Sequence, residues 1–307
     1  MERPDETVRR RLAALTPERR SALMERIRRE RVSAPARPGP RDILTPFRLE
    51  GSRPPLFLVH PSGGSTAPYL PLVRSLGEDQ PCVGIDAVGL DGTPPLTSVA
   101  DMAERYREAV RSVRPHGPYH LAGWSVGGGL AHALATCLRA RGEQVALLVL
   151  LDAPEPPLLA APPDTADVLA LFAENLALTA GSVPPSVSAG ELRGLPYEAQ
   201  VSTVLRRLAD AGSAPAGAEE FVRARMAVFE AALVAGALWR PERYDGRVDL
   251  VRAEEGHAGD ETARGWSAWT SEAVVTHRVP GDHYSMVRFP QVERLAAILR
   301  QQLDRVL

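Results

Sequence analysis

Gly123-Trp124-Ser125-Val126-Gly127 decides the fold of this chain, because this G-x-S-x-G stretch lies between an expected strand and an expected helix. Residues 119–122 form a short, mostly apolar run, and leucines and alanines recur at helical spacing from Leu130 to Leu138. A serine at such a turn has strained backbone angles, and the flanking glycines let neighbouring backbone approach closely. We therefore expect Ser125 to be a nucleophile at the positive end of a helix.

Short apolar runs alternate with helical patterns on both sides of this turn. Residues 145–151 contain no polar side chain, as expected of a central parallel strand that is covered on both faces. The other expected strands and helices are strands 56–59, 82–85, 248–252 and 274–279, and helices 99–113 and about 290 to the end. The sequence thus predicts an α/β fold with a mostly parallel central sheet, helices on both faces, and functional residues at the carboxyl ends of strands.

The region from about 155 to 238 interrupts this alternation. It begins with a proline-rich stretch, continues with helical patterns at 164–178, 191–210 and 217–238, and contains no strand pattern. The last of these helices has a broad apolar face that includes Phe221. We interpret this face as core packing, with part of it as a possible wall of a substrate channel.

The first 42 residues differ in composition from the rest of the chain. Residues 17–31 are expected to form a short basic helix, which is either a solvated linker helix or a docking segment for a partner protein. Residues 33–40 are rich in proline and typical of an extended linker. We therefore divide the chain into an N-terminal helix and linker, 1–42, and an α/β domain, 43–307.

Composition excludes several classes of protein. A chain of 307 residues with 44% hydrophobic content is long enough for one α/β domain with extensions. The formal charge of −2 gives no basic field for nucleic acid, and no signal sequence or membrane-spanning apolar run occurs. Cys82 and Cys137 lack metal-ligand spacing and favour buried, reduced thiols. We expect a cytoplasmic protein with no metal or cofactor of its own.

A serine nucleophile needs a histidine to take its proton and an acid to orient that histidine. His283 lies in a polar turn directly after the last expected strand, and it is the predicted base. The predicted acid is Asp152, which ends the buried run 145–151. The rival position is the loop after the next strand, with Glu254, Glu255 and Asp260. In either case the chain order is serine, acid, histidine.

An oxyanion hole for this serine requires two N–H donors. The backbone N–H of Val126, directly after the nucleophile, is the expected first donor. The loop of residues 60–64 follows the first expected strand of the alternating pattern and supplies the second, with Ser62 preferred and Gly63 next. His60 precedes Pro61 and is a candidate for shaping the site entrance.

Four separated motifs in this order resemble the thioesterase domains of nonribosomal peptide and polyketide synthetases, which have the α/β-hydrolase fold. The motifs are Pro54-Pro55-Leu56-Phe57-Leu58-Val59-His60-Pro61-Ser62-Gly63-Gly64, Gly117-Pro118-Tyr119-His120-Leu121-Ala122-Gly123-Trp124-Ser125-Val126-Gly127-Gly128, Leu150-Leu151-Asp152 and Gly281-Asp282-His283-Tyr284-Ser285-Met286. The resemblance covers about residues 43–305, and the helical region matches in position and character more than in sequence.

The resemblance implies that Ser125 accepts the acyl group, with His283 as base and Asp152 as its partner. It also implies that residues of about 155–238 form a lid over an acyl pocket, and that the substrate arrives on the phosphopantetheine of a carrier protein. No carrier signature of the Gly-Gly-x-Ser type precedes the domain, so we expect the carrier in trans unless the chain is an excised part of a synthetase.

The expected activity is therefore release of an acyl, peptidyl or polyketide chain, by hydrolysis or macrocyclisation, in antibiotic-type biosynthesis. The alternatives are an editing thioesterase that removes stalled chains and a small-ester hydrolase on the same fold. A noncatalytic interaction scaffold is the hypothesis from another class, and an intact serine, acid and histidine argue against it.

Overall fold

The computed structural model describes residues 42–157, 161, 163–213, 218–255 and 265–307. Residues 43–307 form one compact unit, which contains all the strands and helices given below. The helix predicted at 17–31, the linker predicted at 33–40 and the rival acid Asp260 lie outside the described residues. The division into segments 1–42 and 43–307 stays a prediction.

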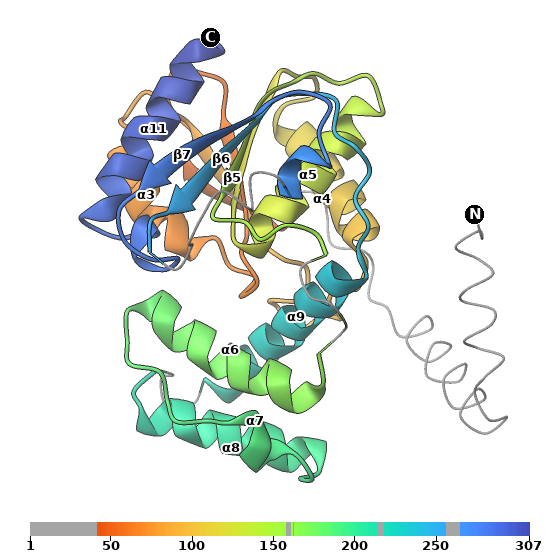
Figure 1. The fold of residues 1–307 in the computed structure, drawn as a ribbon, viewed down its shortest axis with the longest axis vertical. Helices are drawn as coiled ribbons and strands as arrows, with labels where there is room; N and C mark the ends of the chain where they lie inside the picture. The colour runs from red at the N-terminus through yellow and green to blue at the C-terminus, as the bar shows by residue number, and fades with distance from the viewer. Residues whose placement is uncertain (1–41, 158–160, 162, 214–217, 256–264) are drawn as a thin grey trace, which may run out of the picture. The chain divides into compact units, whose positions relative to one another are not determined.

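In the described part of the chain, seven strands form one sheet in the order β1-β3-β2-β4-β5-β6-β7 (Figure 1). Neighbouring strands run parallel except for the edge pair β1 and β3. The strands are β1 Leu44–Arg48, β2 Leu56–Val59, β3 Cys82–Ile85, β4 Tyr119–Trp124, β5 Val145–Leu151, β6 Val248–Ala253 and β7 Val274–Val279. The predicted mostly parallel sheet is confirmed, and β1 is a strand that the sequence patterns did not indicate.

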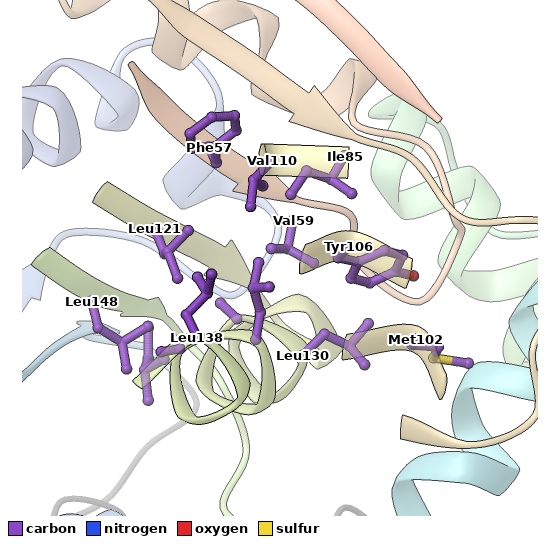
Figure 2. Close-up of a cluster of buried hydrophobic side chains, with 14 of the residues drawn as sticks. Phe57, Val59, Ile85, Met102, Tyr106, Val110, Leu121, Leu130, Leu138 and Leu148 are labelled. Atoms are coloured by element: carbon purple, nitrogen blue, oxygen red, sulfur yellow. The ribbon is translucent and has the colours of Figure 1, made fainter. Parts of the chain in front are cut away.

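Alternate residues of the central strands build two separate cores, one on each face of the sheet. Phe57 and Val59 of β2 belong to one buried cluster, while Leu56 and Leu58 belong to the other. Figure 2 shows the first cluster, where strand side chains meet those of the helices α4 (Val99–Val113) and α5 (Val126–Arg139). Burial on both faces explains why these strands appear in the sequence as continuous apolar runs.

Helices cover both faces of the sheet, as predicted (Figure 1). One face carries α4 and α5, and the other carries α3 and α11. Their bounds are α3 Leu70–Ser75, α4 Val99–Val113, α5 Val126–Arg139 and α11 Gln291–Arg305, with short 3-10 turns at Ala67–Tyr69 and Ser285–Val287. Ser98 caps α4 by accepting the backbone N–H of Asp101, which fixes where this helix begins.

Between β5 and β6, the described residues form four helices with a hydrophobic core of their own. They are α6 Thr165–Ala180, α7 Ala189–Leu192, α8 Tyr197–Asp210 and α9 Glu219–Leu238 (Figure 1). Helix α9 joins this core to the main one, because Phe229 packs in the first while Ala232 and Ala235 pack in the second. We call α6 to α9 the inserted helices.

Two predictions for the inserted helices were wrong in detail. The single helix expected at 191–210 is divided into α7 and α8, because Pro196 precedes α8 and restricts the backbone before it. Phe221, expected on a buried face, is 53% exposed. It lies in the first turn of α9, where its neighbour Val222 is the residue that packs into the core of these helices.

The two cysteines are free, but only Cys82 is buried as expected, and Cys137 is half-buried. Within the described ranges, no helix is both long enough and apolar enough to span a membrane.

Candidate active site

Ser125 occupies the junction between β4 and α5. Its backbone angles are φ 60° and ψ −130°, a strained combination for a residue with a side chain. A Cβ atom on Gly123 would come within 2.0 Å of the carbonyl oxygen of Gly127, so the turn can close only with glycine at this position. The predicted strand, turn and helix around Ser125 are therefore present.

The loop after β2 packs directly against the first turn of α5. A Cβ on Gly127 would lie 2.6 Å from the carbonyl oxygen of Val59 and 2.5 Å from that of His60. Within the described chain, no backbone acceptor is bonded to the N–H of Ser62, and the N–H of Val126, the first residue of α5, has no partner within its helix. Unpaired N–H groups at a helix start and in an adjacent loop are what an oxyanion hole requires.

Asp152 follows the last residue of β5 and is held by its neighbour β6. Its backbone has φ 45°, and its N–H donates to the carbonyl of Val251 at 2.7 Å. Its Oδ1 accepts the N–H of Ala253 at 3.1 Å, and the residue is only 2% exposed. The carboxylate therefore has a fixed orientation at the carboxyl end of the sheet.

His283 lies in the loop after β7 and brings its ring to this carboxylate. Its Nδ1 lies 2.7 Å from Oδ2 of Asp152, and Arg252 Nη1 lies 3.6 Å from Oδ1. Burial opposes ionisation of Asp152, but the hydrogen bond from His283 and the charges of His283 and Arg252 outweigh it, so the pKa of this carboxyl is lowered. An ionised Asp152 accepts the proton on Nδ1, which leaves Nε2 as the acceptor nitrogen of the neutral ring.

The two rival acids that lie in the described chain, Glu254 and Glu255, are not paired with His283. Glu254 and Glu255 are exposed, and their backbone N–H groups bond to Val279 and Gly281. Neither carboxylate forms a hydrogen bond or ion pair with a histidine in the part of the chain that the structure describes. Of the three candidate acids that the structure describes, Asp152 is the one that it brings to His283.

Trp124 is a positioning residue that the sequence reasoning missed. Its indole Nε1 donates to the backbone carbonyl of His283 at 3.0 Å, and the two rings lie 5.0 Å apart. The residue before the candidate nucleophile thus holds the loop of the candidate base. Tyr69 acts similarly, because its hydroxyl accepts the N–H of Trp124 and donates to the carbonyl of Val59, each at 2.7 Å. No motif marks either role in the sequence.

His60 does not line an entrance, since it is 1% exposed. Its ring lies 2.6 Å from the hydroxyl of Tyr106 and 2.7 Å from the carbonyl oxygen of Pro61. Burial lowers the pKa of His60, which favours the neutral ring. The side chain therefore anchors the loop that carries Ser62.

Comparison with known proteins identifies a family for this arrangement. The family model described as "Thioesterase domain" matches residues 54–303, which include all the elements of the site. A dimodular nonribosomal peptide synthase of Bacillus subtilis is 42% identical over 185 residues, 59% of this chain. A malpibaldin synthetase of Mortierella alpina is 50% identical over 111 residues, 36% of this chain. This chain spans only 7% and 2% of these two relatives.

A solved structure shares both the fold and most of the length. The thioesterase domain of NocB, determined as a covalent complex with a fluorophosphonate nocardicin G analogue, is 27% identical with a TM-score of 0.62. The match covers 85% of this chain and 99% of that one. The seven-stranded sheet and its helices, within the residues that the structure describes, are thus an α/β-hydrolase fold.

Proposed function

The chain belongs to the thioesterase domain family, and from this premise we propose that it releases an acyl or peptidyl chain from a carrier protein through an ester on Ser125. The hydrogen bond between His283 and buried Asp152, beside the strained Ser125, is the observation that carries the proposal. The nonribosomal peptide synthetases among the relatives support a chain bound to phosphopantetheine as the substrate class.

In the acylation step, Ser125 Oγ attacks the thioester carbonyl while His283 Nε2 takes the hydroxyl proton. Asp152 keeps the other ring proton on Nδ1 and stabilises the imidazolium that forms. The N–H groups of Val126 and Ser62 donate to the oxyanion. The carbon–sulfur bond then breaks, and the imidazolium returns a proton to the departing pantetheine thiolate.

In the release step, a second nucleophile attacks the Ser125 ester. Either water or a hydroxyl or amine of the bound chain gives up its proton to His283, and the serine leaves with that proton. Water yields a free acid, and an internal nucleophile yields a macrocycle. Both outcomes use the same three side chains, so the inserted helices α6 to α9, proposed as the lid, select between them through shape and water access.

The experiment that tests this function is intact-mass analysis of the protein after incubation with acyl chains on pantetheine and on a separate holo carrier protein. We expect a serine-dependent acyl adduct or product with the parent protein and neither with Ser125→Ala. A parent protein that forms no adduct, gives no product and resists fluorophosphonate labelling would fit the noncatalytic scaffold instead.

The same substrate panel separates the remaining alternatives. Preference for a long carrier-bound chain supports chain release, whereas broad turnover of short acyl thioesters supports an editing thioesterase or small-ester hydrolase. Activity with the separate carrier supports action in trans, and analysis of the product mass distinguishes hydrolysis from macrocyclisation.

A further inference from the structure

Arg225 of α9 lies against the loop that carries the proposed oxyanion donor. A Cβ on Gly63 would be 3.2 Å from Nη2 of Arg225 and 3.8 Å from Oδ1 of Asn175, which belongs to α6. Asn175 is held in turn by Tyr284, whose hydroxyl oxygen accepts its Nδ2 hydrogen at 3.2 Å. Two of the inserted helices therefore aim polar groups at the backbone next to Ser62.

Arg225 has no partner of opposite charge among the described residues. Its Nε is buried without a hydrogen-bond acceptor there, and the guanidinium lies 5.4 Å from the ring centre of Phe221. The charge of Asp86 acts on Arg225 without an ion pair between them, and the Asp86 carboxylate accepts hydrogen bonds from Thr45 and Thr66.

A neighbouring arginine on the same helix shows the contrast. Arg223 pairs with Glu219 at 3.0 Å and with Glu198 at 3.1 Å. Burial lowers the pKa of Arg225, yet an arginine keeps its charge in proteins. The buried, unpaired Nε–H of this charged group is costly unless a ligand accepts it.

The position of Arg225 limits what this ligand can be. The loop of Gly63 packs on the first turn of α5, so the guanidinium lies close to a chain esterified to Ser125. The phosphate of a pantetheine arm is separated from the thioester by the whole length of the arm. A planar guanidinium matches the two oxygens of a carboxylate.

We propose that Arg225, together with Asn175, forms a subsite for a carboxylate on the acyl chain, in the unit next to the Ser125 ester. This inference rests on the proposed function, since it concerns the chain that Ser125 accepts. Arg225 is then a specificity-determining residue that selects chains with an acidic side chain in that unit.

The test uses two peptidyl N-acetylcysteamine thioesters that differ only in a Glu or Gln residue at the thioester end. These substrates carry no phosphate, so any preference comes from the acyl chain. The rate of Ser125 acylation is measured by quenched intact-mass analysis. We expect the Glu chain to react about 10- to 100-fold faster, as for one charge-assisted pair.

Variants on the same helix isolate the contribution of Arg225. Arg225→Gln should slow only the reaction of the Glu chain and so remove the preference. Arg225→Lys should keep part of the preference, because the positive charge remains but the paired guanidinium donors are lost. Arg223→Gln is the matched control and should keep the preference. Fluorophosphonate labelling of Ser125 in each variant verifies that the site is folded.

Equal rates for the two chains in the parent protein, or a preference that survives in Arg225→Gln, would overturn the inference. The parent protein could instead prefer phosphopantetheine over pantetheine thioesters, through Arg225, and show no preference for Glu. That result would assign the subsite to phosphate and overturn the proposal of a carboxylate subsite. Absence of any acyl adduct counts against the proposed function alone. The subsite is then tested by calorimetry, which compares the binding of the same two thioesters to Ser125→Ala.

Discussion

Two buried aspartates in this fold each contact a histidine, but their surroundings differ. Asp152 meets His283 at the carboxyl end of β5, with Nδ1 2.7 Å from the carboxylate. Asp249, the second residue of β6, meets His277 of β7, with Nε2 2.9 Å from the carboxylate. Both aspartates are almost completely buried, and the pKa of each is lowered.

The partners of the two carboxylates explain why we propose chemistry at only one of them. Asp249 also pairs with Arg247 at 2.7 Å and with Arg305 at 3.0 Å, so several donors occupy its oxygens. It lies within a strand, where no strained turn presents a nucleophile. An aspartate and a histidine in contact are thus not sufficient for catalysis. The serine elbow and the open oxyanion donors distinguish Asp152 and His283.

The largest expected effect is the difference in acylation rate between variants of the two histidines. His283→Gln should lower the rate of Ser125 acylation about 10⁴- to 10⁶-fold, because no other group takes the serine proton. His277→Gln should stay within about twofold of the parent. Single-turnover acylation followed by intact-mass analysis measures both, and similar losses in the two variants would refute the assignment of the base.

The second largest expected effect is the difference in turnover between variants of the two aspartates. Asp152→Asn should slow turnover about 10²- to 10⁴-fold, because an amide cannot hold the Nδ1 proton or stabilise the imidazolium. Asp249→Asn should leave kcat nearly unchanged. Near-normal turnover by Asp152→Asn would move the role of the acid to Glu254, Glu255 or Asp260.

For Asp249 we expect an effect on stability rather than on turnover. Asp249→Asn should lower the free energy of unfolding by about 1–3 kcal/mol, because it removes a buried carboxylate that accepts charge-assisted bonds from two arginines and His277. Asp304→Asn is a matched control, because Asp304 pairs with Arg53 but its side chain is 58% exposed. We expect this variant to lower the free energy of unfolding by about 0.5 kcal/mol or less. Urea denaturation measures both.

The smallest expected effect is a pH dependence of this stability. Burial opposes ionisation of Asp249, but its bonds to His277 and Arg247 and the charge of Arg305 lower its pKa below the value of about 3.9 in the unfolded chain. Between these two values the unfolded chain binds more protons, so this stabilisation is complete above about pH 4 to 5 and is lost as pH falls through the folded value. The parent protein should lose more stability than Asp249→Asn between pH 5 and 3, and parallel urea midpoints would contradict this.

Much of the fold could be predicted because its strands are buried on both faces. Residues 145–151 are apolar throughout and form β5 as predicted. The edge strand β1 escaped prediction, because it contains Pro46 and its residues are exposed or only half-buried. The division of α7 from α8 was missed although Pro196 marks it.

The candidate site was predictable where its residues border strands and turns. The positions of Ser125, Asp152 and His283 follow from the ends of β4, β5 and β7, and their catalytic roles stay a proposal. The positioning roles of Tyr69 and Trp124 could not be predicted, because their bonds to the Val59 carbonyl and the His283 loop join segments distant in the chain.

The sequence by itself determined the elbow around Ser125, the strand pattern and the order of serine, acid and histidine, because these depend on local spacing and apolar periodicity. Only the tertiary structure decided which acid contacts His283, since the order of strands β5-β6-β7 brings residues 131 positions apart to one edge. It also decided that Arg225 lies against Gly63 rather than in an ion pair, because that contact depends on how α9 packs against α4 and α5.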